Sequence, residues 1–329
     1  MRNLIVDGPY FDDLEVGQTV LDAPGQTLTD GLAALHTAIV GDRLRLALDA
    51  ELSRRVTGGR MAPPALVWNV AIGQSTVFTR RAIANLFYRG FVFRRFPNIG
   101  DTIYTVTEVV ALRQNRVRQG RAPTGLVVLR IRTRNQHDEE VLDFYRCAML
   151  PMRAPGLTSH QADLAQIPSE LNTARMTEAF AEWRLDHFRQ AVPGPHFADM
   201  VPGTTWEVVA GDVVSSAPEL ARLILNLAMV HHDAKAAGGH RLVYGGHTIG
   251  IAAGQVVRAL PNLVTIVAWH SCDHLAPVRE GDTLHSSIEL ERTEALASGG
   301  LVHLRARVRA DRESGSEEVL DWRFVALMA

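Results

Sequence analysis

Two stretches of this 329-residue chain set its architecture: PPALVWNVAIGQSTVFTRRAIAN at residues 63–85, and GHTIGIAAGQVVRAL at residues 246–260. Each stretch is rich in apolar residues and carries few charges, so each is predicted to form a helix that is buried on most sides. Gly73-Gln74 in the first stretch recurs as Gly254-Gln255 in the second, at a spacing of 181. Two such helices of related sequence indicate an internal repeat.

The similarity extends outward from both stretches with a nearly constant spacing. Phe11, Asp13, Gly17 and Thr19 recur as Phe197, Asp199, Gly203 and Thr205 at a spacing of 186; Gly58, Arg60 and Gly100-Asp101-Thr102 recur as Gly239, Arg241 and Gly281-Asp282-Thr283 at a spacing of 181; and Val141-Leu142-Asp143 recurs as Val319-Leu320-Asp321 at a spacing of 178. The drift in spacing amounts to short loop deletions, so we infer a gene duplication. Thr29 and Ser215, also at a spacing of 186, each precede a helical pattern that a hydroxyl can cap.

Four predicted strands follow the central helix in each half. They are rich in Val, Ile, Phe and Thr and are separated by turn residues, as hairpin-linked antiparallel strands are. The predicted strands span residues 86–95, 103–112, 125–134 and 141–151 in the first half, and 263–274, 284–292, 301–310 and 319–328 in the second. The predicted fold class is therefore α+β, a tandem (double) hot-dog fold in which two antiparallel sheets each wrap a long buried helix. We divide the chain into an N-terminal hot-dog (1–152), a connector (153–195) with one helix at 176–190, and a C-terminal hot-dog (196–329).

The composition excludes several classes of protein. The net charge of −2 includes no excess of basic residues, so nucleic acid is not an expected partner. No stretch reaches the roughly 18 apolar residues that a membrane span needs, and residues 1–8 do not resemble an export signal. Cys147 and Cys272 lie in predicted strands of different halves, without a C-x-x-C spacing. We therefore expect a cytoplasmic protein with no membrane partner.

Four further stretches carry a resemblance to a known family: DRLRLALDA at 42–50, AIGQS at 71–75, ANLFYRG at 84–90 and LVYGGHT at 242–248. With them, the chain resembles the MaoC-like dehydratases in their double hot-dog form, and within that family the mesaconyl-CoA (2-methylfumaryl-CoA) hydratases. The resemblance covers nearly the whole chain apart from the connector. It implies reversible addition of water to a 2-enoyl-CoA thioester, such as mesaconyl-CoA giving 3-methylmalyl-CoA. Coenzyme A is then part of the substrate, no other cofactor or metal is needed, and a homodimer of the fused chain is the candidate assembly.

The family motif is an Asp, an Asn two residues later and a His five residues after the Asp, in the helical overhang before the central helix. The matching residues of the second half are Asn226, Ala228 and His231, whereas the first half keeps Asp42 but has Ala47 at the His position. The resemblance thus implies that His231 is the catalytic base, since the pKa of an imidazole lies near working pH. Asp42 would line a vestigial second pocket unless the fold brings it across.

Hydration also needs a group that delivers a proton to the α carbon. The sequence leaves three candidates for this acid: Asp233, His232, and a water molecule held by Asn226.

The turn Tyr244-Gly245-Gly246 precedes the second central helix. Unpaired backbone N–H groups and the helix dipole at this point can stabilise a thioester oxygen that gains negative charge. The corresponding first-half residues are Ala62-Pro63-Pro64-Ala65, and a proline has no N–H to offer. Together with the missing His, this asymmetry predicts a single active site, in the second half.

Other residues near the turn have two interpretations each. Tyr244 either orients the acyl group or packs, and His247 either supports the helix start or contacts substrate. Arg241 is a candidate cation for the free carboxylate of a dicarboxylic substrate. The basic run at 113–121 is either a solvated face or a grip on the phosphates of coenzyme A.

The remaining alternatives concern metal binding and other activities. His270, Cys272 and His274 would share one side of a strand, but Arg89, Phe91 and Phe93 at the matching first-half positions favour a packing surface over a metal site. A hot-dog thioesterase would place an Asp or Glu on the central helix, and neither 63–85 nor 246–260 contains one. A non-catalytic acyl-CoA-binding protein is the third alternative, because neither half keeps the complete Asp and His pair.

Overall fold

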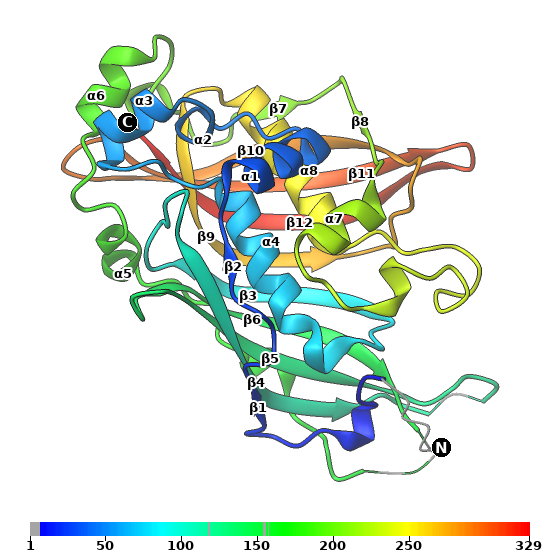
Figure 1. Ribbon diagram of the computed structural model, residues 1–329. Coiled ribbons are helices and arrows are strands. Elements are labelled where there is room, and N and C mark those ends of the chain that lie inside the picture. The colour runs from blue at the N-terminus through cyan, green and yellow to red at the C-terminus, as the bar shows by residue number, and fades with distance from the viewer. Residues whose placement is uncertain (1–6, 118, 154–155, 157) are drawn as a thin grey trace.

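The computed structural model describes residues 7–329 except 118, 154–155 and 157. The described residues exclude residues 1–6, part of the stretch in which no export signal was found, and Arg118 of the basic run. Two similar series of elements follow one another along the chain (Figure 1). Among the described residues, no helix combines the length and the apolar character that crossing a bilayer requires.

The first series opens with short elements that precede the central helix α4, and it ends with four long strands. Its elements are η1 (Phe11–Asp13), β1 (Thr19–Val20), β2 (Gln26–Thr27), α1 (Asp30–Val40), α2 (Arg45–Leu48), α3 (Ala50–Thr57), α4 (Pro64–Gln74), η2 (Ser75–Thr79), β3 (Ala84–Phe93), β4 (Thr102–Gln114), β5 (Thr124–Asn135) and β6 (Glu140–Pro151).

The second series has the same order around its central helix α8. Its elements are η4 (Phe197–Asp199), β7 (Thr205–Glu207), β8 (Asp212–Val213), α7 (Ala217–Leu223), η5 (Met229–His231), α8 (Gly245–Ala259), β9 (Leu263–His274), β10 (Thr283–Ala295), β11 (Gly300–Arg312) and β12 (Gly315–Met328). The elements between the two series are η3 (Leu164–Gln166), α5 (Thr173–Glu178) and α6 (Leu185–Ala191).

The predicted double hot-dog fold is confirmed, with one addition. The order of paired strands is β1-β4-β5-β6-β3-β9-β12-β11-β10-β7, and each pairing is antiparallel. Because β3 pairs with β9, the two expected sheets join into one continuous sheet across the middle of the molecule. Helices α4 and α8 lie together against this sheet (Figure 1). Every residue of α4 and the segment 246–257 of α8 are buried.

The repeated residues have the same structural duties in both halves. The side-chain amide of Gln74 donates to the carbonyl oxygen of Ile103 at 3.0 Å, and that of Gln255 donates to Leu284 at 2.8 Å. Each glutamine therefore ties its central helix to the second long strand. Gly100 and its counterpart Gly281 have φ angles of 105° and 92°, which suit glycine at the turn before that strand.

Aromatic side chains fill the boundary between the halves. Trp68 of α4 meets Trp269 of β9 with ring centroids 5.1 Å apart, and Trp269 stacks on Phe91 of β3 at 4.1 Å. Trp322 of β12 lies 5.4 Å from Trp269. These large buried rings provide apolar area that holds α4, β3 and β9 together as one core.

Three local predictions are wrong at their boundaries. The first central helix ends at Gln74 rather than at residue 85, because the hydroxyls of Ser75 and Thr76 bond back to backbone carbonyls at 2.6 Å and compete with the helix. Thr29 caps α1 as predicted, whereas α7 has Ser216 rather than Ser215 at its N-cap, with φ 58° and no capping bond from its side chain. The single helix expected at 176–190 is split into α5 and α6, since the N–H of Arg184 bonds to Val56 on α3 at 2.9 Å.

Candidate active site

A cavity of about 340 Å³ lies between the two halves. The second half contributes the overhang before α8, the start of α8 and the end of β9. The first half contributes the start of β3 and part of β6. The lining residues are 82–86, Tyr88, Arg146 and Met149 of the first half, with 230–231, 242–245, Thr248 and 274–278 of the second. The site is therefore composite, although the sequence pointed to the second half alone.

His231 lines this cavity at the end of η5. Its Nδ1 lies 2.8 Å from the carbonyl oxygen of Leu242. A carbonyl oxygen only accepts hydrogen bonds, so Nδ1 carries the proton, and Nε2 of the neutral ring keeps its lone pair. Burial lowers the pKa of His231 to about 4, and the positive charge of Arg146 lowers it as well, against the opposing effect of the Leu242 hydrogen bond. The imidazole is thus neutral at neutral pH and able to accept a proton.

The other predicted catalytic residues lie outside the cavity lining and stabilise the overhang. Asn226 is buried, and its Oδ1 accepts from the N–H of Ala228 at 2.9 Å, which leaves it poorly placed to hold a catalytic water. His232 donates from Nε2 to the carbonyl oxygen of Asn226 at 2.7 Å. Asp233 is exposed, and its Oδ1 accepts from the N–H of Lys235 at 2.8 Å. These three polar groups serve local turns rather than the cavity.

Asp42, the retained acid of the first half, has the same duty as Asn226. Its Oδ1 accepts from the N–H of Leu44 at 2.9 Å, two residues further on. It borders a separate hollow of only about 10 Å³ together with Ala65 and Trp68, so the fold does not bring it to His231. The first motif position is therefore a turn-forming residue in both halves.

The turn before α8 faces the cavity as the sequence suggested. Tyr244 and Gly245 line it, and Tyr244 is the N-cap residue of α8. Within the described chain, the backbone N–H groups of Gly245 and Gly246 bond to no protein acceptor. The hydroxyl of Tyr244 is buried, also without a partner among the described residues, and burial raises the pKa of this hydroxyl well above its ordinary value. Tyr244 is therefore a protonated donor beside His231, with ring centroids 5.7 Å apart.

Close packing explains both glycines of the turn. A Cβ on Gly245 would lie 2.6 Å from the ring of His274, and a Cβ on Gly246 would lie 2.2 Å from Oδ1 of Asn69 on α4. Gly246 itself does not line the cavity, so its role is to let α4 and α8 approach. His247 is fully buried, neither ring nitrogen has a partner among the described residues, and it is not in the cavity lining. Of the two interpretations of His247, the structure favours the one in which it supports the helix start.

Tyr88, Arg146 and His274 are among the polar lining residues that sequence reasoning missed. Burial lowers the pKa of His274 to about 4, so this imidazole is neutral. Arg146 is only 4% exposed and donates to Oδ1 of Asn85 at 2.8 Å and to Oγ of Ser75 at 3.1 Å.

The internal repeat held a signal for these three residues. At spacings of 181, 178 and 181, their counterparts are the apolar residues Trp269, Phe324 and Phe93. Strand pairing agrees with this, because Tyr88 pairs with Arg146 as Trp269 pairs with Phe324. Where matching core positions are polar in one half and apolar in the other, the two halves differ in function at that place.

The side chains proposed for a metal do not converge. His270 bonds through Nε2 to Nδ1 of His303 at 3.0 Å, whereas His274 lines the cavity and Cys272 is fully buried. In the part of the chain that the structure covers, no three His, Cys, Asp or Glu side chains are grouped to hold a metal ion.

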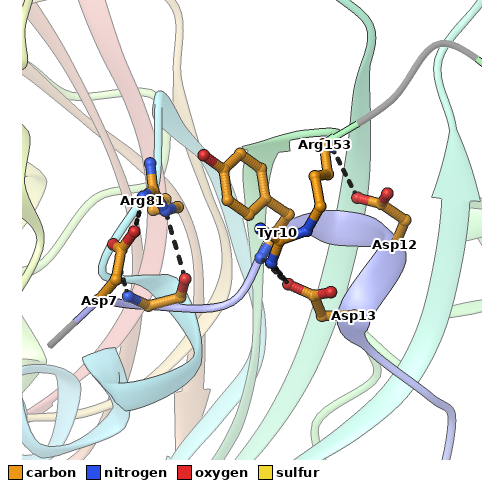
Figure 2. Close-up of polar contacts among 7 residues, drawn as sticks. Asp7, Tyr10, Asp12, Asp13, Arg81 and Arg153 are labelled. Atoms are coloured by element: carbon orange, nitrogen blue, oxygen red, sulfur yellow. Dashed lines mark hydrogen bonds and ion pairs between the residues drawn. The ribbon is translucent and has the colours of Figure 1, made fainter. Parts of the chain in front are cut away.

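Arg81, a cation beside the cavity, is held by the N-terminal segment. A second hollow of about 430 Å³ shares Ala82, Ile83 and Leu242 with the cavity and is bordered by Arg81 and Arg279. Figure 2 shows Arg81 paired with Asp7 and bonded to the carbonyl oxygen of Gly8. Arg81 also lies 4.2 Å from the ring centroid of Tyr10, and Arg153 lies 4.3 Å from the same ring.

Two predicted basic contacts lie elsewhere. Arg241 is exposed, pairs with Glu280 at 2.7 Å and is not in the lining of the cavity. The described residues of the basic run 113–121 lie at the end of β4 and in the connection to β5, and they do not line the cavity either.

No family model matches this chain. The beta-methylmalyl-CoA dehydratase of Chloroflexus aurantiacus is 30% identical over 296 residues, which cover 86% of this chain and 82% of that protein. The mesaconyl-CoA hydratase of Cereibacter sphaeroides is 27% identical over 311 residues, covering 92% and 89%.

Two solved structures extend the likeness to the whole fold. A Mycobacterium tuberculosis protein with a double hotdog fold is 51% identical with a TM-score of 0.90, covering 98% of this chain and 99% of the other. A MaoC domain protein of Chloroflexus aurantiacus is 28% identical with a TM-score of 0.84, covering 98% and 97%. The resemblance seen in the sequence is thus confirmed, and the chain belongs to the double hot-dog MaoC-like family of hydratases and dehydratases.

Proposed function

We propose that the protein is a hydro-lyase that adds water reversibly to a 2-enoyl-CoA thioester, with mesaconyl-CoA and 3-methylmalyl-CoA as the preferred pair. The names of the two curated relatives support this choice of acyl group. The observation that carries the proposal is a neutral imidazole, His231, whose Nε2 is free to act in a cavity that also contains the unpaired N-terminal turn of α8.

His231 acts first as the general base. Its Nε2 takes a proton from a water molecule while the water oxygen forms a bond to the β carbon of the enoyl group. The electron pair of the double bond moves toward the thioester, whose oxygen gains negative charge. Because burial keeps the ring neutral, the base is in its active form throughout the physiological pH range.

The start of α8 is placed to stabilise the enolate oxygen. The N–H group of Gly245, which lines the cavity, lies at the positive end of a 15-residue helix, and the Tyr244 hydroxyl is a further donor. Donors that are fixed before the reaction stabilise developing charge strongly, and removal of one such donor typically costs about 3 kcal/mol of transition-state stabilisation.

We propose that His231 also returns the proton. The acids suggested by the sequence, Asp233 and His232, bond to the overhang outside the cavity. The described lining contains no Asp or Glu. The imidazolium that forms in the first step can deliver its Nε2 proton to the α carbon, which regenerates the neutral ring and completes the addition of water. One group acting on both carbons requires that hydroxyl and proton add to the same face.

The first half is proposed to have no active site of its own. The positions that match His231, Tyr244 and Arg146 hold Ala47, Pro63 and Phe324. We also propose a cytoplasmic location, supported by two buried cysteines that form no disulfide. A further homodimer remains a prediction, which light scattering of the purified chain can test.

The experiment follows the absorbance of the conjugated enoyl thioester with wild type, His231→Gln and a control, His187→Gln, on α6. We expect hydration of mesaconyl-CoA by wild type and by the control, with a loss of about 100-fold or more in kcat for His231→Gln. Wild-type-like turnover by His231→Gln would refute the assigned base. Binding of acyl-CoA without turnover would instead indicate a binding protein, and release of free thiol would indicate a thioesterase.

A further inference from the structure

Arg146 is a buried cation without an anion. It lies on β6, is 4% exposed and borders the cavity. Both of its side-chain partners, Asn85 and Ser75, are neutral, and it pairs with no carboxylate in the described part of the chain. Other arginines of the same sheet are paired: Arg130 with Asp143 at 2.9 Å, and Arg305 with Asp321 at 2.6 Å.

The fold does not need a cation at this position. In the second half, the same place on β12 holds Phe324, which is fully buried and pairs with Trp269 as Arg146 pairs with Tyr88. A buried charge without a counter-ion is unfavourable, so an arginine in place of a packed aromatic ring destabilises the free protein. An anion that enters the cavity would offset that cost.

We propose that Arg146 binds the free carboxylate of a dicarboxylic acyl group and thereby sets the substrate class. This inference rests on the proposed function, because it assumes that an enoyl thioester occupies the cavity. Nη2 donates to no acceptor among the described residues, and the planar guanidinium fork matches a carboxylate in two parallel hydrogen bonds.

Arg146 is placed to bind the acyl end of the substrate rather than the phosphates of its coenzyme A. In mesaconyl-CoA the carboxylate is bonded to the carbon that receives the hydroxyl, so its receptor must lie close to the base. Arg146 lines the same cavity as His231 and His274, and its positive charge lowers the pKa of both imidazoles. The phosphates of coenzyme A are expected outside, where Arg81 and Arg279 border the neighbouring hollow.

The test compares mesaconyl-CoA with 2-methylcrotonyl-CoA, which has a methyl group in place of the carboxylate on the same carbon skeleton. We expect wild type to prefer mesaconyl-CoA in kcat/KM by at least about 30-fold, the factor typical of a buried charge pair. Arg146→Met should lose this preference while its rate with 2-methylcrotonyl-CoA changes only a few-fold. Arg307→Met, which removes an exposed arginine of β11, should keep the preference.

Each alternative result has a separate meaning. Equal rates of wild type with both thioesters would overturn the role of Arg146 and leave hydration intact. Retention of the preference by a folded Arg146→Met variant would overturn it as well. If wild type hydrates neither compound, the proposed function fails. Calorimetric binding of the two thioesters to wild type then tests the role of Arg146 separately. Tighter binding of mesaconyl-CoA supports Arg146 as the carboxylate-binding residue, and equal binding overturns that role. The wild-type comparison also stands if the variant does not fold.

Discussion

Acid should destabilise this fold through two buried imidazoles that lie outside the cavity lining. His36 of α1 and His247 of α8 are both fully buried. Nε2 of His36 lies 2.9 Å from the side-chain amide of Asn69, and the two ring nitrogens of His247 have no partner among the described residues. Burial lowers the pKa of His36 to about 3, and a charge on His247 lowers it as well. Burial lowers the pKa of His247 to about 4, against the opposing effect of the Glu280 carboxylate.

The sign and size of the effect follow from proton binding. Between pH 6.5 and pH 4 the unfolded chain binds a proton at each of these rings and the folded chain does not, so the free energy of unfolding falls as the pH falls. A group that changes from 6.5 to about 4 contributes a slope of up to about 1.4 kcal/mol per pH unit. Between pH 7.5 and pH 5 each ring should then remove about 2 kcal/mol.

A single variant isolates this effect. His247→Leu uses the residue that the first half has at the matching position, Leu66, and it removes one of the two titrations. Urea unfolding, followed by tryptophan fluorescence, should show a loss between pH 7.5 and pH 5 that is smaller by about 2 kcal/mol in the variant than in wild type. His187→Leu, on the surface helix α6, controls for the loss of an imidazole. If wild type and His247→Leu lose the same free energy over this range, the buried neutral histidine is the wrong explanation.

Two further predictions concern the base and the packing of α4. With a pKa of about 4 for His231, kcat/KM should stay level from pH 8 to pH 6 and decline only below about pH 5. The assays must be brief enough to precede unfolding. A decline of kcat/KM centred near pH 6.5 would contradict the assignment of His231 as the base. Gly73→Ala should destabilise the protein by several kcal/mol or prevent folding, because its Cβ would lie 1.7 Å from the carbonyl oxygen of Ile224. Gly31→Ala, at an open position of α1, should instead be neutral or raise the unfolding free energy by up to about 1 kcal/mol, as measured by urea unfolding.

Local patterns were sufficient for most elements. The strand expected at 263–274 is β9 with the same bounds, because its apolar run is bounded by turn residues on both sides. The central helices were located by their lack of charge. The end of α4 was missed because hydroxyl side chains can close a helix through bonds that periodicity does not record. The break between α5 and α6 was missed because its cause is a contact with α3, which is distant in sequence.

In the active site too, the sequence predicted the features that depend on local spacing and missed those that depend on tertiary contacts. The motif register placed His231, and the glycine turn placed the start of α8, since both depend on spacing within one half. The motif residue Asn226 suggested a group that holds a catalytic water, but its Oδ1 accepts from the N–H of Ala228 and forms a turn, and the spacing alone does not distinguish these two roles. Arg241 was chosen for its charge, whereas its position beside Glu280 makes it a surface ion pair.

The sequence by itself determined the duplication, the type of each long element and the imidazole that distinguishes the second half, because these are properties of neighbouring residues and of fixed spacings. Only the tertiary structure decided that β3 joins β9 and that the cavity is shared by both halves. Arg146 and His231 lie far apart in the chain, in different halves, and no periodicity relates them. They line the same cavity because the apolar faces of two helices and one continuous sheet are buried together. That burial brings the start of β3 and the middle of β6 opposite the overhang of the other half.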